Sequence, residues 1–274
     1  MIIIADSSCD IWTLPDVAFA SVPLDIYTDE RRFVDDETLD VSEMLEYLKG
    51  FKGRSYTSCP SSQRWIDAFD GEDEVYIVTL TSGLSGTYNS AEIAREMYLE
   101  THPDAKVLVV DSLSTSSEMN LIIQKIRELK LQGMEFDEVC REIAAYQKRT
   151  RLFFAFESLH NFAQNGRVPK ILEQAVGFLG LTVLGTADEE GHVKPTGKGR
   201  GCKKVVSSLL SQMKAAGYAG GKVVITHVKN EKLAKAFSEK LLEAYPGAEV
   251  EIYPSRGLVA YYAEEHGIIV GCEC

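Results

Sequence analysis

The chain has 274 residues, and its 41 acidic against 29 basic side chains give a formal net charge of −12 at pH 7. This length suits one large hydrophobic core or two modest ones, and the negative charge argues against nucleic acid or an anionic membrane surface as the main partner. No window approaches 18 consecutive apolar residues, and the apolar start at Met1–Ile4 is too short for a signal peptide. We therefore predict a cytoplasmic protein with no stable membrane insertion.

The cysteine and histidine spacings give no sign of a metal centre. Six cysteines are scattered along the chain, only Cys272 and Cys274 lie close together, and no C-x-x-C occurs. The five histidines show no spacing typical of metal ligands either. We expect reduced thiols, no metal and no cofactor.

One unit recurs in the first half of the chain: a short apolar strand, a turn rich in serine and aspartate, and then a helix. Strands are predicted at 1–5, 75–80 and 107–110, and a further strand at 18–26 is interrupted by Pro23. The carboxyl ends of parallel strands meet at one edge of a sheet, so the turns after the first three strands should lie side by side. Thr57 and Ser58 would then complete a pocket floor lined with hydroxyl groups.

Other elements of this half are predicted from local signals. Residues 28–40 read as acidic and irregular, a helix begins at Asp40, and a second helix follows Pro60. A third helix follows the turn at 82–87, with Asn89 as a candidate N-cap.

The turn at 82–87 joins a buried strand to that helix, and it contains two glycines and several hydroxyl side chains. Strand, hydroxyl-rich glycine loop and helix form the arrangement in which an open α/β sheet binds an anionic group. The alternative is a tight turn whose hydroxyls only cap the helix. A Walker loop is excluded because no lysine follows Gly86, and a nucleophile elbow is excluded because the second glycine comes one place early.

The pattern changes after a predicted strand at 152–156. A helix is interrupted at 165–167, and a hairpin is predicted around 188–191. A helix, a strand at 222–227, a second helix, a strand at 250–253 and a terminal strand at 268–272 follow. This second half reads as mixed α+β. The fold class is therefore α/β, with a parallel-sheet α/β domain at 1–150 and a mixed-sheet α+β domain at 151–274.

A basic cluster at 196–204 stands out in an acidic protein. It is either a solvated surface before an amphipathic helix or a cationic rim that faces an acidic ligand or partner. Arg167 and Arg200 are the best candidate anion contacts, because a guanidinium can bind a carboxylate through two hydrogen bonds. Lys203 and Lys204 would add to a partner-binding surface.

Several motifs resemble those of the DegV family, which includes the fatty-acid-binding subunit of bacterial fatty acid kinase. The resemblance runs nearly end to end, and its motifs are Asp6-Ser7, Val22-Pro23-Leu24, Thr57-Ser58-Cys59-Pro60-Ser61, Leu84-Ser85-Gly86-Thr87-Tyr88-Asn89-Ser90-Ala91, Asp111-Ser112, Asn165-Gly166-Arg167 and Gly197-Lys198-Gly199-Arg200-Gly201.

This resemblance implies a two-domain fold with a long-chain fatty acid held between the domains. It implies that Thr57 or Ser58 and Ser85, with the Gly86 amide nearby, hold the carboxylate, and Arg167 is the candidate cation. It also implies a lipid carrier that is not catalytic and that delivers its acid to a separate kinase subunit. A hydrolase or phosphotransferase using the Ser85 loop, or a scaffold that has lost lipid binding, are the alternatives.

The sequence departs from the family pattern near its end. The family's H-T-G-P-G motif aligns with Ala263-Glu264-Glu265-His266-Gly267, so Ala263 replaces a histidine that helps to bind the carboxylate. The glycine pattern after Asp111-Ser112 is also altered, to Ser116-Ser117-Glu118. We therefore expect weaker binding of acids than in relatives, or comparable binding of a neutral head group, with Arg167 compensating in part.

Overall fold

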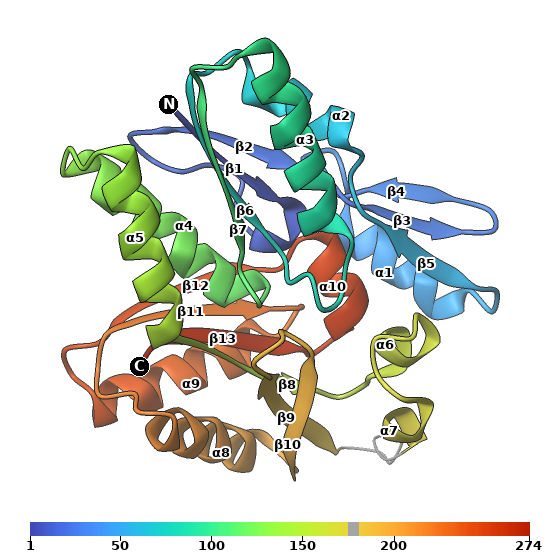
Figure 1. The fold of residues 1–274 in the computed structure, drawn as a ribbon. Coiled ribbons are helices and arrows are strands. Elements are labelled where there is room, and N and C mark those ends of the chain that lie inside the picture. Colours follow the sequence, from blue (N-terminus) through green and yellow to red (C-terminus); the bar gives the residue numbers. More distant parts are fainter. Residues whose placement is uncertain (175–180) are drawn as a thin grey trace.

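The computed structural model describes residues 1–174 and 181–274, which form three β-sheets with helices packed between and around them (Figure 1). The first sheet is wholly parallel and has the order β2 (Ala18–Val22), β1 (Ile2–Asp6), β6 (Glu74–Thr79), β7 (Lys106–Asp111). The turns after β1, β6 and β7 therefore lie side by side, as the repeated unit predicts.

The two central strands of the parallel sheet, β1 and β6, are buried on both faces, because apolar residues occupy most of their successive positions. In β6, Val75 and Ile77 face α2 (Ser62–Phe69) and α3 (Thr87–Thr101), whereas Tyr76 and Val78 face α4 (Ser116–Leu131) and α5 (Phe136–Tyr146). Helix α3 begins directly after its turn with Gly86 as the N-cap, so the prediction of Asn89 as the cap is wrong. Ser85 accepts a hydrogen bond from the Thr87 amide and so stabilises this earlier start.

A small antiparallel sheet projects beside the first sheet. Its order is β4 (Arg32–Val34), β3 (Asp25–Thr28), β5 (Ser55–Ser58), and α1 (Val41–Gly50) packs near it with Asp40 as its N-cap. Pro23 lies between β2 and β3, and the two strands enter different sheets there. Residues 28–40 are not wholly irregular as predicted, since Arg32–Val34 pair with β3.

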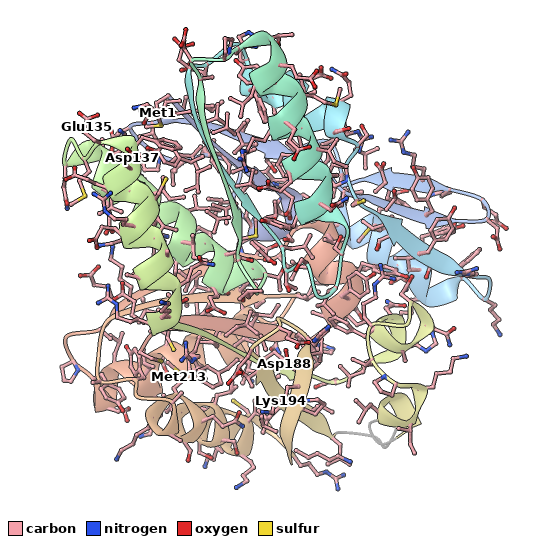
Figure 2. All side chains as sticks on the ribbon, viewed as in Figure 1. Met1, Glu135, Asp137, Asp188, Lys194 and Met213 are labelled. Atoms are coloured by element: carbon pink, nitrogen blue, oxygen red, sulfur yellow. The ribbon has the colours of Figure 1, made fainter. Side chains whose placement is uncertain are left out.

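The third sheet contains the strands of the second half, in the order β10, β9, β8, β13, β11, β12. Helices α8 and α9 cover one face, where Met213 of α8 is wholly buried, and α4 covers the other face (Figures 1 and 2). The bounds are β8 (Thr150–Phe156), β9 (Thr182–Ala187), β10 (Val193–Gly199), β11 (Lys222–His227), β12 (Glu249–Pro254), β13 (Ile268–Glu273), α8 (Cys202–Ala215) and α9 (Glu231–Ala244). The remaining short elements are η1 (Ser7–Cys9), η2 (Gln147–Arg149), α6 (His160–Gln164), α7 (Lys170–Gln174) and α10 (Gly257–Ala263).

The change from the parallel sheet to the mixed sheet falls between β7 and β8, close to the predicted boundary at 150. One hydrophobic core nevertheless extends across both halves, because α4 packs on both sheets. A Cβ atom at Gly271 of β13 would lie 2.5 Å from the Glu118 backbone nitrogen, so this glycine permits the close approach of α4. The division into domains at 1–150 and 151–274 stays a prediction. Among the described residues, no helix is both long and apolar enough to cross a bilayer.

Candidate functional site

A cavity lies where the carboxyl edge of the parallel sheet meets the mixed sheet and α10. It encloses about 790 Å³ of space free of protein atoms, a figure that includes space open to solvent. Both halves of the chain contribute to it. The lining residues are Leu24, Thr57, Leu80, Thr81, Leu84, Ser85, Ser114, Thr115, Leu152, Phe154, Phe156, Phe162, Arg167, Thr186, Ala187, Gly191, His192, Val193, Leu258, Val259, Tyr262, Ala263 and Ile269.

A row of aromatic rings forms one wall of the cavity. Alternate residues of β8 share a face, so Phe154 and Phe156 both point inward, with ring centroids 4.5 Å apart. The row continues from Phe156 to Phe162 of α6 at 6.0 Å and from Phe162 to Tyr262 of α10 at 4.8 Å. A Cβ atom at Gly185 would lie 2.1 Å from the Phe154 ring, so the glycine leaves room for that ring. The wall is suited to an extended apolar ligand.

The aromatic row ends at hydroxyl groups. The Tyr262 hydroxyl is hydrogen-bonded to Thr57 Oγ1 at 2.8 Å. Thr57 and Ser58 are neighbours on β5 and therefore point to opposite faces of its sheet. Ser58 is exposed, lies outside the cavity lining, and donates to the Cys59 carbonyl oxygen. Of the two residues predicted from this motif, the structure brings only Thr57 to the cavity.

Ser85 lines the same end of the cavity. Its Oγ lies 2.8 Å from Thr87 Oγ1 and accepts a hydrogen bond from the Thr87 amide. Gly86 is exposed and lies outside the lining residues, but as the N-cap of α3 it places the positive end of the helix dipole beside Ser85. Among the described residues, these partners of the Ser85 hydroxyl include no histidine or carboxylate that could act as a general base.

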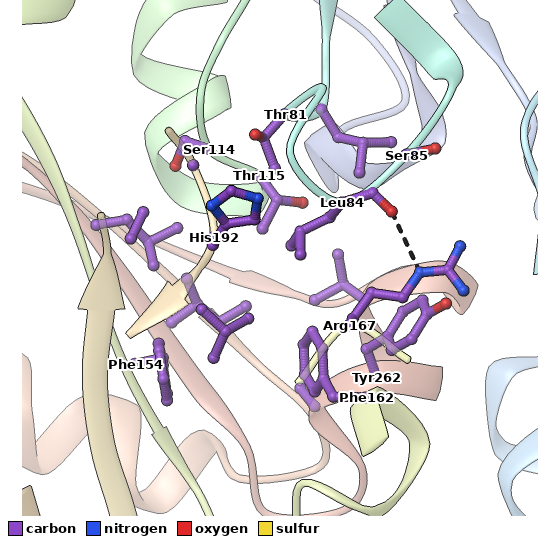
Figure 3. A pocket seen from close by; sticks show the side chains of 18 of the residues that line it. Thr81, Leu84, Ser85, Ser114, Thr115, Phe154, Phe162, Arg167, His192 and Tyr262 are labelled. Atoms are coloured by element: carbon purple, nitrogen blue, oxygen red, sulfur yellow. Dashed lines mark hydrogen bonds between the residues drawn. The ribbon is translucent and has the colours of Figure 1, made fainter. Parts of the chain in front are cut away.

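Arg167 supplies a cation at this end. Its Nε donates to the Leu84 carbonyl oxygen at 3.2 Å (Figure 3). Its Nη1 donates to the Asn165 carbonyl oxygen at 2.6 Å. Both acceptors are neutral, and no carboxylate in the described part of the chain forms an ion pair with Arg167. Burial raises the pKa of Tyr262, and the charge of Arg167 is among the effects that oppose this rise. An anion near Ser85 and Tyr262 would therefore meet the positive charge of Arg167, which no carboxylate among the described residues pairs with.

The segment that departs from the family pattern also meets the cavity. Ala263 is buried and offers only a methyl group to the lining. The two acidic residues after it do not line the cavity: Glu264 accepts from the Ser158 hydroxyl, and Glu265 pairs with Lys49 and Lys229. Glu264 and Glu265 therefore do not repel an anion from within the cavity lining.

The predicted partner-binding residues lie elsewhere. Arg200, Lys203 and Lys204 are exposed at the junction of β10 and α8, and none of them lines the cavity. They form a basic surface separate from the polar end of the cavity.

The opposite end of the cavity has polar groups that were not among the individual candidate site residues. Thr81, Ser114, Thr115 and His192 gather there, and Leu84 lies between them and the Arg167 end (Figure 3). The Ser114 hydroxyl donates to buried Glu118 at 2.6 Å, and burial raises the pKa of that carboxyl group. A signal for Ser114 was present in the serine-rich turn after β7. None marked His192, Phe162 or Tyr262.

Comparison with known proteins places this geometry in a family. The family described as uncharacterised protein, DegV family, matches residues 1–270. A DegV domain-containing protein of Streptococcus pneumoniae strain R6 is 41% identical over 275 residues, which cover 99% of this chain and 98% of that protein.

Solved structures agree with this match. A DegV family protein from Eubacterium eligens, loaded with heptadecanoic acid, has a TM-score of 0.98 and 46% identity, covering 100% of this chain and 99% of that one. The fatty acid kinase (Fak) B3 protein of Streptococcus pneumoniae, loaded with linoleic acid, has a TM-score of 0.97 and 40% identity, covering 99% and 98%. A DegV family protein from Ruminococcus gnavus, refined with vaccenic acid, has a TM-score of 0.90 and 28% identity, covering 98% of each chain. The chain belongs to the DegV family.

Proposed function

We propose that this protein binds one long-chain fatty acid in the cavity, with the carboxylate at the end formed by Thr57, Ser85 and Arg167. The observation that carries the proposal is an extended apolar wall that ends at hydroxyl groups and at the Arg167 guanidinium, which has no carboxylate partner within residues 1–174 and 181–274 that the structure describes. The fatty acids bound by the Eubacterium eligens and Streptococcus pneumoniae proteins support the same ligand class.

The tail should supply most of the affinity. Burial of each methylene contributes about 0.8 kcal/mol, so a sixteen-carbon chain gains on the order of 10 kcal/mol before entropic costs. One hydrogen bond to a charged carboxylate contributes roughly 1.5–3 kcal/mol. The polar end therefore orients the ligand, and the apolar wall retains it.

The protein acts in this proposal as a carrier that presents its acid to a separate kinase, and it has no catalytic role of its own. The kinship with the Fak B3 protein supports this part. Arg200, Lys203 and Lys204 would contact an acidic surface of that kinase, since they are exposed and lie outside the cavity.

The direct test is extraction of ligand from the purified protein, followed by mass spectrometry. A co-purifying long-chain acid at about one per chain is the expected result. A protein that contains no lipid, takes up no added fatty acid, and instead turns over ester or phosphate substrates would refute the carrier proposal.

Replacement of Ser85 by alanine tests the polar end. The variant loses one hydroxyl contact to the carboxylate, and binding should weaken by roughly 10- to 100-fold, corresponding to about 1.5–3 kcal/mol. Ser58→Ala is the matched control, because Ser58 lies outside the cavity lining. Affinities measured by displacement of a fluorescent fatty acid should separate the two variants. Equal affinities would exclude Ser85 as a head-group ligand.

Replacement of Ala263 by histidine tests the departure from the family pattern. Ala263 lines the cavity without a polar group, so the native protein should prefer a fatty acid over the matching alcohol by less than about 100-fold. An imidazole donor at this position should increase that preference. The measurement compares acid and alcohol affinities for both proteins. A native preference above that limit, unchanged by the histidine, would contradict this account.

A further inference from the structure

Two cysteines on the mixed sheet, Cys272 and Cys274, lie side by side, and neither lines the cavity. Cys272 is in β13 and Cys274 follows it two positions later, so both side chains are on one face of the sheet. Their sulfur atoms are 3.5 Å apart and share a hydrogen bond. No other two cysteines in residues 1–174 and 181–274 are hydrogen-bonded to each other, and all six are free thiols.

The two thiols differ in exposure and in acidity. Cys272 is wholly buried, whereas Cys274 is partly exposed. The hydrogen bond from Cys272 lowers the pKa of Cys274, and the positive charge of Arg151 acts in the same direction. The same bond, together with burial, raises the pKa of Cys272. Cys274 is therefore the more reachable and the more acidic of the two thiols, and Cys272 is the one that releases its proton less readily.

We propose that Cys272 and Cys274 form a redox-active dithiol, which a low-molecular-weight disulfide such as oxidised glutathione converts into an intramolecular disulfide. The Cys274 thiolate attacks one sulfur of the small disulfide, and one small thiolate leaves. Cys272 then loses its proton and attacks the Cys274 sulfur, and the second small thiolate leaves. Two electrons pass from the protein to the reagent, and the two protein protons end on the two released thiols.

The surroundings of the two cysteines favour a disulfide that is easily reduced. A disulfide needs its sulfur atoms about 2.05 Å apart, so the present separation must shorten. The backbone N–H of Cys274 donates to the Arg149 carbonyl oxygen at 2.5 Å, and this contact holds Cys274 in its reduced position. Movement of Cys274 toward buried Cys272 would disturb the contact. Strained or exposed disulfides are the labile and regulatory ones.

The experiment equilibrates the protein in glutathione buffers of increasing oxidation, quenches with acid, alkylates free thiols, and records the intact mass. The native protein should pass from six alkylated thiols to four, without a retained glutathione. Cys272→Ser should instead retain one glutathione on Cys274, since the resolving thiol is absent. Cys202→Ser, which removes an exposed cysteine elsewhere, is the matched control and should pass from five to three.

Phenylarsine oxide provides a second measurement that requires no substitution in the buried strand. This trivalent arsenical bridges two adjacent thiols and should bind the folded native protein and Cys202→Ser, but not Cys274→Ser. The proposal is overturned if the native protein keeps six alkylatable thiols in every buffer, or if Cys274→Ser loses two thiols as the native protein does. It is also overturned if the arsenical binds Cys202→Ser and Cys274→Ser equally.

Discussion

Replacement of Leu84 by tryptophan is expected to reduce the affinity for octadecanoic acid by roughly 100-fold or more. Leu84 is half-buried on the loop after β6 and lies between the two polar ends of the cavity (Figure 3). The larger indole would occupy space for about four methylene groups. At about 0.8 kcal/mol for each, the loss is about 3 kcal/mol.

The same substitution should change the preference for chain length. The Leu84 carbonyl oxygen, which accepts from Arg167, belongs to the backbone and is retained in the variant. The carboxylate end is therefore preserved, and dodecanoic acid should lose much less affinity than octadecanoic acid.

The control is Leu131→Trp, because Leu131 is 52% exposed at the end of α4 and lies outside the cavity. The measurement compares the affinities of the two variants for both acids, by displacement of a fluorescent fatty acid from proteins of matched thermal stability. If Leu84→Trp weakens both acids equally, the indole meets the part of the tail that the two acids share and the predicted change in chain-length preference is wrong; if it weakens neither acid, Leu84 does not line the path of the tail.

The sequence predicted the scaffold of the site because its signals are local. Runs such as Val75–Val78 identify buried strands, and the serine-rich turns after them identify one edge of the sheet. The choice of Ser85 followed from the glycine loop. The choice between Thr57 and Ser58 could not be made, because hydroxyl groups occupy successive positions of β5 and so give no alternation of polar and apolar residues. Thr57 is distinguished from Ser58 only by the contact of β5 with α10, where Thr57 is hydrogen-bonded to Tyr262.

The rest of the site depends on contacts between distant parts of the chain. Tyr262 meets Thr57 across 205 positions, and no local pattern indicates that pair. The aromatic wall needs β8, α6 and α10 together, and Gly185 reads in sequence only as an interruption of a strand. The removal of Glu264 and Glu265 from the lining was also not predictable, because their partners Ser158, Lys49 and Lys229 come from three other segments.

Arg256 connects the two halves of the protein, and its replacement by methionine should lower the free energy of unfolding by about 3–5 kcal/mol. It is 3% exposed, and its Nη1 donates to the Ile11 carbonyl oxygen and the Ser21 hydroxyl. Its Nη2 donates to the backbone carbonyl oxygen of Asp35. The buried side-chain carboxylate of Asp35 accepts hydrogen bonds from the first two amides of α10. Without the guanidinium, buried Asp35 would lose its ion-pair partner. The control is Arg31→Met: the Arg31 side chain is 50% exposed in its pair with Glu43, so the change should cost about 1 kcal/mol or less.

The same cluster should make stability depend on pH. Burial raises the pKa of Asp10 from 3.8 to about 8, even though the carboxylate accepts from the Arg256 amide and the Ser116 hydroxyl. The folded state thus binds a proton that the unfolded state has released. The stability from this proton is fully present below the unfolded pKa and is lost as the pH rises through about 8.

Chemical denaturation at about pH 6.5 and about pH 8.5 measures this effect, and the native protein should be less stable at the higher pH. His227 contributes in the opposite direction, because burial lowers its pKa from 6.5, but most of its stabilisation is lost only at pH values below this window. Asp10→Asn retains an acceptor for the Arg256 amide, and it should reduce the difference between the two pH values. Arg256→Met should increase that difference, because the Arg256 charge opposes the rise in the pKa of both Asp10 and Asp35. A native protein that is equally stable at both pH values, with an Asp10→Asn variant that behaves identically, would show that Asp10 is ionised in the folded state throughout.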